Sequence, residues 1–299
     1  MTAEARPILL IGGNGQIGWE LRQALAPLGA VRVLDRAALD LASAEAIRGA
    51  VRETAPGLIV NAGAYTAVDR AESEPDLAQA VNGSAPGILA EEAKRLGAAL
   101  VHYSTDYVFD GRLTRPYRED DPTGPISAYG RSKLAGEQAI AAVGGAYLIL
   151  RTAWVYSLRG ANFLTTIGRL AAQQEELRVV DDQRGAPTWA RAIAEATALI
   201  LTRCNARSGP GELGERGGLY HLSAAGETTW FGFAEAIIAG MRAAGDRLSA
   251  REAVPIATAD YPTPAQRPAW SVLDCGKARD AFGVALPHWR DQLGRCMKR

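Results

Sequence analysis

Tyr129 and Lys133 lie four residues apart in the segment Tyr-Gly-Arg-Ser-Lys, and their types and spacing can carry acid–base chemistry. Residues 128–142 have a helical pattern, and positions i and i+4 of a helix lie on one face. We therefore expect the Lys133 ammonium to lie beside the Tyr129 ring, where it favours the phenolate and lowers the tyrosine pKa from about 10. A phenol tuned in this way can give or take a proton near neutral pH. Because this spacing occurs by chance in many helices, its weight depends on its surroundings.

A hydroxyl and a carboxylate follow an apolar run that ends 24 residues before Tyr129. The run 99–105 reads as a strand, and Thr105 and Asp106 stand where it ends. The carboxyl ends of strands in α/β sheets are where ligands bind. Thr105 is therefore our candidate for a hydrogen bond to the substrate oxygen that Tyr129 would protonate, with Asp106 next to it.

A glycine-rich segment connects the first expected strand, 7–13, to a helical pattern over 17–28. Gly12, Gly15 and Gly18 form GxxGxxG in this turn. Gly12 permits the tight turn, Gly15 lets the backbone approach a pyrophosphate, and Gly18 lets helix and strand pack closely. The amide groups at the helix N-terminus are free to bind phosphate. The segment predicts a dinucleotide site.

The residues after the second strand, 30–35, leave the choice of dinucleotide open. Asp35 stands where an acid binds the ribose hydroxyls of NAD, whereas Arg36 beside it suits the 2′-phosphate of NADP. Asp40, in Leu-Asp-Leu, is a candidate neighbour of the adenine. We therefore expect a nicotinamide cofactor, either NADPH or NADH.

The elements that must position these residues alternate along the first half of the chain. Continuously apolar strands are expected at 7–13, 30–35, 57–64, 99–105 and 146–156, and helices at 17–28, 43–54, 75–96 and 128–142. Strands that are apolar throughout are typical of a parallel sheet covered on both faces. The fold class is therefore α/β, a Rossmann-type doubly wound parallel sheet.

The strand–helix alternation loosens after Tyr156. A surface loop is expected at 205–218, one more sheet strand near 218–224, and helices separated by a proline-rich stretch after 228. We expect a dinucleotide-binding domain of residues 1–156 and 186–222. A smaller C-terminal α/β substrate domain would comprise 157–185 and 223–299.

Composition excludes several classes of protein. The 299 residues include 33 Lys and Arg and 33 Asp and Glu, so the net charge is zero and no general nucleic-acid binding is expected. The beginning of the chain lacks a secretory pattern, and no apolar run reaches about 18 residues, so no membrane partner is expected and a cytoplasmic enzyme is the default. The spacings of the three cysteines and three histidines match neither a disulfide framework nor a metal site.

Longer segments resemble a known family. The sequence is similar to the extended short-chain dehydrogenase/reductases, and more closely to the dTDP-4-dehydrorhamnose reductases. The segments that carry this resemblance are GGNGQIGWEL, VNAGAYTAVDRAESEP, HYSTDYVFDG, YGRSKLAGE, RTAWVY, DDQRGAPT and YPTPAQRP. They run from Gly12 to Pro268 and so cover nearly the whole chain.

The resemblance implies a role for each matching residue. Tyr129 would be the proton donor, Lys133 its partner at the nicotinamide ribose, and Thr105 the group that binds the reacting oxygen. The cofactor would lie along Gly12, Gly15, Gln16, Ile17, Gly18, Asp35, Arg36, Asp40, Leu41, Ala62, Gly63 and Ala64, and would also contact the catalytic Tyr129 and Lys133. A nucleotide-sugar substrate would meet Asp106 and Trp154 at the sugar and Arg267 at the diphosphate.

The resemblance also concerns a metal and the oligomeric state. Some members of the family bind Mg²⁺ through glutamates near a subunit contact, and Glu20 fits that pattern. The residue three after the threonine of Gly-Ala-Pro-Thr is Arg191, where a glutamate would be needed. A cation there would meet a guanidinium, so we expect no metal site of that kind. A homodimer is expected from the family.

Three functions remain open from the sequence. The first is reduction of a 4-keto-6-deoxy nucleotide sugar to dTDP-L-rhamnose by NADPH or NADH, with Tyr129 protonating the new alkoxide. The second is a nucleotide-sugar epimerase or dehydratase that recycles its bound cofactor, for which an acid beside Thr105 would serve. The third is a non-catalytic regulatory subunit that senses dinucleotide.

Overall fold

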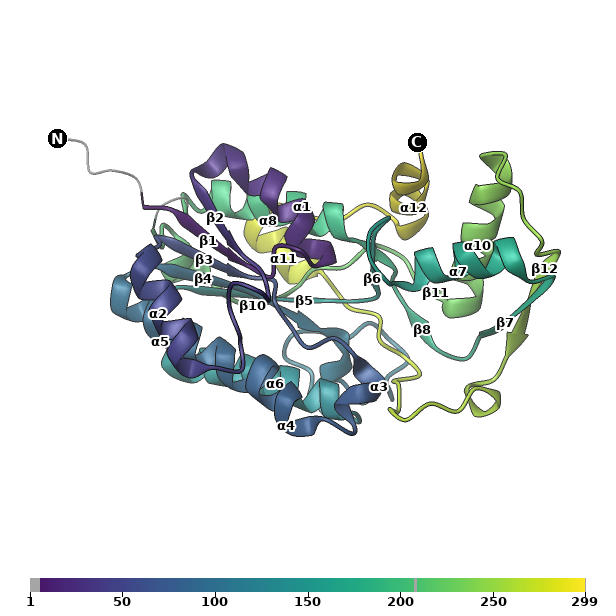
Figure 1. Cartoon of the computed structure of the whole chain (residues 1–299), viewed down its shortest axis with the longest axis horizontal. Helices are drawn as coiled ribbons and strands as arrows, with labels where there is room; N and C mark the ends of the chain where they lie inside the picture. Colours follow the sequence, from purple (N-terminus) through teal and green to yellow (C-terminus); the bar gives the residue numbers. More distant parts are fainter. Residues whose placement is uncertain (1–5, 207–208, 299) are drawn as a thin grey trace.

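A parallel sheet of six strands forms the centre of the molecule (Figure 1). The computed structural model describes residues 6–206 and 209–298 of the chain. The strands follow the order β10-β5-β4-β3-β1-β2, and every neighbouring pair is parallel. Their bounds are β1 (Ile8–Ile11), β2 (Val31–Leu34), β3 (Leu58–Asn61), β4 (Ala99–Thr105), β5 (Tyr147–Thr152) and β10 (Gly218–His221). The predicted doubly wound fold is confirmed.

The sheet is buried on both faces because its side chains alternate between two cores. Ile8 and Leu10 of β1 join one core, whereas Leu9 and Ile11 join the other. The first core is closed by α1 (Gln16–Leu25), α8 (Ala190–Arg203) and α11 (Gly276–Phe282), and the second by α2 (Ala44–Thr54), α5 (Ala85–Leu96) and α6 (Ala128–Val143). Figure 1 shows these two helix layers on opposite sides of the sheet.

Two of these helices begin at serine caps. The Ser43 hydroxyl accepts a hydrogen bond from the Ala46 amide at the start of α2, as the sequence predicts, and Ser127 accepts one from Gly130 at the start of α6. The predicted helix at 128–142 is therefore confirmed. The predicted helix at 75–96 is instead three consecutive pieces: α4 (Pro75–Ala78), the π-helical η2 (Gln79–Ser84) and α5.

A second part of the chain packs around its own core. Tyr156, Ile167, Phe233, Ile237 and Trp289 belong to this core. It is built from α7 (Phe163–Gln173), β7 (Glu176–Val180), α10 (Trp230–Ala243), β12 (Glu252–Ile256) and α12 (Trp289–Met297), and β7 pairs with β12 in parallel. We call this part the small lobe and the part around the six-stranded sheet the sheet lobe (Figure 1).

The remaining short elements are connections. They are η1 (Ala26–Leu28), α3 (Val68–Ala71), η3 (Asp106–Val108), β6 (Val155–Tyr156), β8 (Arg184–Gly185), β9 (Thr188–Trp189), α9 (Leu213–Arg216), β11 (Thr228–Thr229) and η4 (Thr258–Asp260). None of the helices within residues 6–206 and 209–298 has the length and apolar character needed to cross a membrane.

Two sequence expectations differ from the structure. The strand expected at 146–156 ends at Thr152, because Trp154 has a left-handed backbone with φ of 46° and turns the chain out of the sheet. The segment 223–299 was expected to lie together in the substrate domain, but α11 packs into the core of the sheet lobe. Ala278 and Phe282, spaced four apart on α11, bury their apolar side chains there.

Candidate functional site

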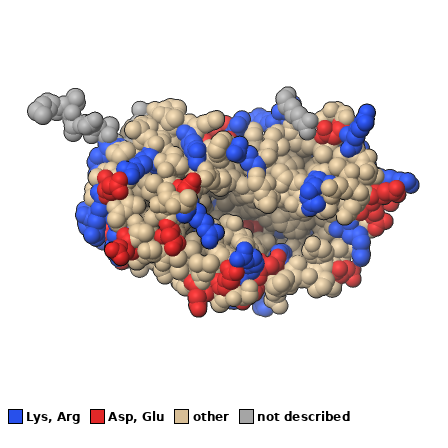
Figure 2. Space-filling model, in the orientation of Figure 1, with Lys and Arg blue, Asp and Glu red and all other residues tan. Residues whose placement is uncertain are grey.

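A cavity of about 1000 Å³ lies where the order of the sheet reverses, between β1 and β3. In a doubly wound sheet this reversal opens a crevice outside the carboxyl ends of the strands, where ligands bind. The glycine segment follows β1, and Ala62, Gly63 and Ala64 follow β3, so both reach this crevice. Figure 2 shows the molecule hollowed between the two lobes, with charges of both signs spread over the rest of that face.

Most of the predicted site residues line this cavity. They are Gly12, Gly15, Gln16, Ile17, Asp35, Arg36, Asp40, Leu41, Ala62, Gly63, Ala64, Thr105, Asp106, Tyr129, Lys133 and Trp154. Gly18 and Arg267 are not among its lining residues. The structure thus brings the predicted cofactor residues and the predicted acid–base residues around one space.

Two of the three glycines are required by the backbone itself. Gly12 has φ of 78°, and a Cβ there would lie 2.4 Å from the amide nitrogen of Gly63. A Cβ on Gly18 would lie 2.1 Å from the Gly12 carbonyl oxygen. Gly18 therefore allows α1 to pack closely against the glycine loop, and it does not line the cavity. Gly15 precedes α1 and is less crowded, although its Cβ would still make a tight contact, 3.3 Å from the Gly12 oxygen. The room above Gly15 and the free amides of α1 fit a dinucleotide pyrophosphate.

The two residues after β2 have different surroundings. The Asp35 carboxylate accepts hydrogen bonds from Asn14 Nδ2 at 2.6 Å and from the amides of Ala37 and Ala38 at 3.0 and 3.2 Å. Asp35 thereby holds the turn that follows the strand. Arg36 lines the cavity and forms no hydrogen bond or ion pair with other residues in the described part of the chain. Its charge acts without a direct bond on Glu74 and Tyr65, so its guanidinium hydrogens are available to an anion in the cavity.

Tyr129 and Thr105 are brought together by a close approach of α6 to the turn after β4. A Cβ on Gly130 would lie 2.2 Å from the carbonyl oxygen of Tyr107, so only glycine allows this approach. A hydrogen bond with Thr105 lowers the pKa of Tyr129, but burial has the larger effect and raises it to about 12. Tyr129 is therefore a phenol that keeps its proton at neutral pH.

The side chain of Lys133 contacts β4, whereas the helix spacing predicts that it lies beside the Tyr129 ring. Its Nζ donates a hydrogen bond to the carbonyl oxygen of Tyr103 at 2.6 Å and lies 3.2 Å from Nε2 of His102. Burial lowers the pKa of Lys133 to about 8, and the charge of Glu137 opposes that shift. The predicted lowering of the Tyr129 pKa by Lys133 is wrong for this structure, because the amine is held beneath β4 and burial dominates at the phenol.

Two buried oxygens beside Thr105 have no partner among the described residues. The Thr105 hydroxyl donates to Asp106 Oδ1 at 3.0 Å, but Asp106 Oδ2 and the hydroxyl of Thr152 are unpaired. Burial raises the pKa of Asp106 to about 6. An unpaired buried polar group costs about 1–3 kcal/mol. Since both residues line the cavity, their free oxygens are fitted to polar groups of a ligand.

The small lobe adds Trp230, which sequence reasoning missed, to the predicted Trp154, and the two form an aromatic wall of the cavity. Trp154 stacks on Trp230, with ring centroids 3.5 Å apart and planes 2° from parallel. A Cβ on Gly185 would lie 2.3 Å from the Trp154 ring, and Trp230 Nε1 donates to Gln183 Oε1 at 3.2 Å. Asn162 and Phe163 line the same wall. Gln183 and Gly185 belong to the DDQRGAPT segment, which was therefore the sequence signal for this wall.

Arg267 is bound to a carboxylate rather than exposed to the cavity. Its guanidinium pairs with both oxygens of Asp69 on α3, at 3.1 and 2.8 Å, and Asp69 also accepts the amide of Ala265 at 3.2 Å. These bonds lower the pKa of Asp69. The pair joins the proline-rich segment to α3 in the sheet lobe.

The residues around Glu20 do not fit a divalent cation. Arg191 Nε donates to Glu20 Oε2 at 2.9 Å, so a guanidinium already neutralises this carboxylate. Within the described ranges, no group of three or more His, Cys, Asp or Glu side chains is arranged to hold a metal ion.

Comparison with known proteins agrees with this geometry. The family model described as the RmlD substrate binding domain matches residues 6–299. The dTDP-4-dehydrorhamnose reductase of Burkholderia thailandensis is 50% identical over 97% of this chain and 98% of its own, and that of Escherichia coli K12 is 44% identical over 97% and 96%. The crystal structure of the Bacillus anthracis dTDP-4-dehydrorhamnose reductase in complex with NADP has a TM-score of 0.88 and 32% identity, over 98% of this chain and 99% of that one.

The matched range extends over almost the entire sequence, and the similarity includes the glycine segment, the β4 end and α6 together. This chain therefore belongs to the family of dTDP-4-dehydrorhamnose reductases described by the RmlD model.

Proposed function

We propose that this chain reduces the 4-keto group of dTDP-4-dehydro-6-deoxy-L-mannose to give dTDP-L-rhamnose. The observation that carries the proposal is one cavity that joins a dinucleotide-type glycine loop to a buried, protonated tyrosine and a threonine hydroxyl. A bound NADPH or NADH supplies the hydride for such a reduction. Arg36, which lines the cavity and has no direct ion pair within the described residues, supports use of the 2′-phosphorylated cofactor.

Tyr129 supplies the proton. Its raised pKa keeps the phenol protonated until negative charge develops on the substrate oxygen. As the carbon–hydrogen bond forms at C4, the Tyr129 O–H bond breaks and the proton goes to that oxygen. The resulting phenolate regains a proton from solvent after the product leaves. Thr105 keeps the substrate oxygen within reach of Tyr129.

The sugar and the diphosphate are held by different groups. The free oxygens of Asp106 and Thr152 accept or share hydrogen bonds with sugar hydroxyls, and Trp154 covers the apolar side of the ring. Arg267 binds the diphosphate after exchanging the carboxylate of Asp69 for phosphate oxygens. That exchange replaces one anionic partner by another and leaves the guanidinium paired throughout.

Two further expectations concern the oligomeric state and the cellular location of the enzyme. The enzyme is a homodimer and works in the cytoplasm, as the family resemblance implies. Analytical ultracentrifugation of the purified chain tests the first, and a sedimentation coefficient of a monomer at micromolar concentration overturns it. Fractionation of cells that express the tagged chain tests the second.

The decisive test follows cofactor absorbance with purified protein and the 4-keto-sugar generated in situ. We expect oxidation of NADPH, and a slower oxidation of NADH, that requires both protein and keto-sugar. Tyr129→Phe is the matched variant and should bind NADPH while losing turnover. Conversion of the keto-sugar without net cofactor oxidation favours an epimerase or dehydratase. Dinucleotide binding with no conversion and a co-purifying enzyme favours the regulatory subunit.

A further inference from the structure

Lys133 has a buried neighbour, His102, whose hydrogen bonds fix where its proton lies. His102 is on β4, is 1% exposed, and contacts Asn61 through Nδ1 and Lys133 through Nε2, both at 3.2 Å. Burial holds the pKa of His102 well below its usual range, and any charge on Lys133 lowers it further, so the ring is neutral and carries one proton. That proton can lie on only one of the two nitrogens.

Asn61 decides which nitrogen carries it. The Asn61 Oδ1 accepts the amide hydrogen of Gly63 at 3.1 Å, which fixes the oxygen end of this side chain. The nitrogen end, Nδ2, therefore faces His102 and donates to Nδ1. Nδ1 is then an acceptor without a proton, and the proton of His102 lies on Nε2, pointing at Lys133. Turning the amide over would leave the Gly63 amide facing a second donor.

A proton on Nε2 constrains Lys133. An ammonium has three donors and no acceptor, so it cannot accept from His102. An uncharged amine accepts the Nε2 proton with its lone pair and still donates to the Tyr103 carbonyl at 2.6 Å. The arrangement in the structure is therefore satisfied only by the amine form of Lys133.

Of the charged groups around Lys133, Glu137 favours the ammonium form, but burial has the larger effect on the Lys133 pKa. Glu137, on the same helix, is paired with both oxygens to Arg151 of β5 at 2.9 and 2.7 Å, so this pair has no net charge. The Glu137 carboxylate also accepts the Ser104 hydroxyl of β4. Tyr129 on α6 keeps its proton, and Asp106 on η3 is engaged by Thr105.

We propose that His102 is a positioning residue whose Nε2 proton holds Lys133 as an uncharged amine in the free protein at alkaline pH, and turns Lys133 toward the cavity once it is protonated. When Lys133 gains a proton, two donors face each other and the ammonium leaves His102. The open direction is the cavity, which Lys133 lines beside Tyr129. Placing the cofactor there rests on the proposed function, and in that case cofactor binding takes up a proton at Lys133.

The histidine tautomer tests the first half of the proposal without substrate or cofactor. The chain has three histidines, so the two-bond proton–nitrogen spectrum of ¹⁵N-labelled protein is simple, and His102→Gln identifies the His102 signals. We expect the Nε2–H form at pH 8.5. The Nδ1–H form, or a doubly protonated ring, overturns the proposal.

Asn61→Asp reverses the arrangement with little change of shape. A carboxylate accepts from both Gly63 and His102 Nδ1, so the His102 proton moves to Nδ1 and Nε2 becomes an acceptor for the ammonium. The control is Asn82→Asp, which adds the same charge at another buried asparagine, one that bonds Tyr65 and Ser132 but not His102. We expect a switch of tautomer in Asn61→Asp and none in Asn82→Asp.

Titration calorimetry tests the second half. NADPH is added at pH 8.5 in two buffers of different ionisation enthalpy, which gives the number of protons taken up. We expect uptake of about three quarters of a proton by the wild type, since a group with a pKa of about 8 is already partly protonated at pH 8.5, and at least a twofold smaller uptake by Asn61→Asp. Equal uptake by both folded proteins overturns the role of His102. Absence of any NADPH binding, with the predicted tautomers present, contradicts the proposed function alone.

Discussion

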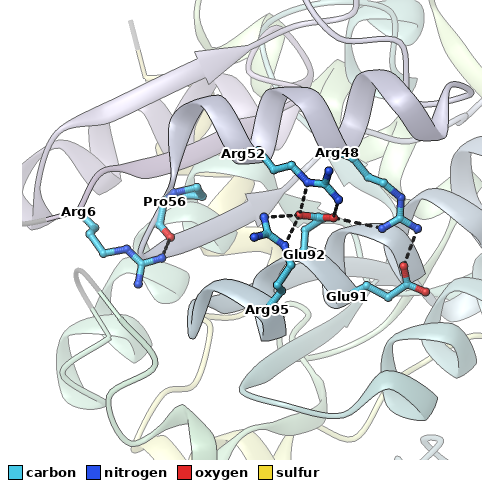
Figure 3. Close-up of polar contacts among 7 residues, drawn as sticks. All are labelled: Arg6, Arg48, Arg52, Pro56, Glu91, Glu92 and Arg95. Carbon is cyan, nitrogen blue, oxygen red and sulfur yellow. Dashed lines mark hydrogen bonds and ion pairs between the residues drawn. The ribbon is translucent and has the colours of Figure 1, made fainter.

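Two buried carboxylates in the sheet lobe have opposite surroundings. Glu92 of α5 is 2% exposed and accepts hydrogen bonds from Arg48, Arg52 and Arg95, at distances between 2.6 and 3.2 Å (Figure 3). Hydrogen bonds from these arginines lower the pKa of Glu92 to about 2. Asp106 is equally buried, but the groups that lower its pKa are the side chains of Ser271 and Thr105 and nearby backbone amides rather than arginines. Its Oδ2 has no hydrogen bond of ordinary geometry within the described residues.

The difference separates a structural charge from a ligand-binding one. Glu92 ties α5 to Arg48 and Arg52 of α2, so its bonding is complete without a ligand. The pKa of Asp106 is raised to about 6 because burial outweighs the hydrogen bonds from Ser271, Thr105 and the backbone. An uncompensated polar group persists at a cost to stability and marks a functional site. The hydrogen-bond partners of a buried charge, rather than its burial, distinguish the two.

The largest effect is expected beside Asp106, at the phenol. Tyr129→Phe should lower kcat by about 10²–10⁴-fold, since it removes the proton donor. Its melting temperature and NADPH affinity should stay close to those of the wild type. Stopped-flow absorbance and calorimetry measure these quantities. A variant that keeps more than a tenth of wild-type turnover would show that another group donates the proton.

Removing the structural charge of Glu92 should lower stability and leave turnover unchanged, which is the reverse of the effect expected for Tyr129→Phe. Glu92→Gln leaves three arginines facing each other and should lower the free energy of unfolding by about 1–3 kcal/mol. Turnover per folded molecule should not change. Urea unfolding and active-site titration measure the two effects. A loss of turnover larger than the loss of folded protein would contradict a purely structural role for Glu92.

The two carboxylates should also give opposite dependences of stability on pH. The folded pKa of Glu92 is depressed, so its contribution is present above its unfolded pKa and is lost as pH falls from about 5 toward 2. The folded pKa of Asp106 is raised, so its ionisation destabilises the fold progressively as pH rises from about 4 through 6.

Asp106→Asn should therefore gain about 2 kcal/mol relative to the wild type between pH 4 and 7. For Glu92→Gln, the free energy of unfolding should instead fall further below that of the wild type as pH rises from 2 to 5. Chemical unfolding at a series of pH values measures both differences. Parallel curves for the two variants would contradict the contrast.

The ion pair between Asp69 and Arg267 combines features of the two carboxylates. Like Glu92, Asp69 is fully paired in the free chain, but we expect this pair to open when substrate binds. Asp69→Asn removes the competing anion and should lower KM for the nucleotide sugar by up to about fivefold, the range of a part-exposed pair worth up to 1 kcal/mol. Arg267→Gln should raise KM. Initial rates at saturating NADPH measure both, and a KM that falls in both variants would exclude diphosphate binding by Arg267.

Local signals predicted the elements and residues that depend on near neighbours in sequence. The glycine loop, the serine cap of α2 and the helix that carries Tyr129 and Lys133 are each defined within about 15 residues. The parallel sheet followed from continuously apolar strands.

The features that sequence reasoning missed depend on contacts between distant segments. The side chain of Lys133 lies against His102 because β4 passes beneath α6, and helix spacing carries no information about this contact. The partner of Arg267 is 198 residues away, and Trp230 reaches Trp154 only through packing of the two lobes. The position of α11 likewise reflects an open place on the sheet rather than its own sequence pattern.

The parallel indoles of Trp154 and Trp230 connect the lobes, one ring following β5 of the sheet and the other beginning α10. Stacked indoles at this separation interact electronically, so the near-ultraviolet absorption and fluorescence of the pair should differ from those of two separate tryptophans. Any rotation of one lobe against the other unstacks the rings and changes both signals. The intrinsic tryptophan signals of the chain therefore report on the separation of the two lobes without a label. Gly185 allows the stacked arrangement, because any side chain at this position would collide with the Trp154 ring.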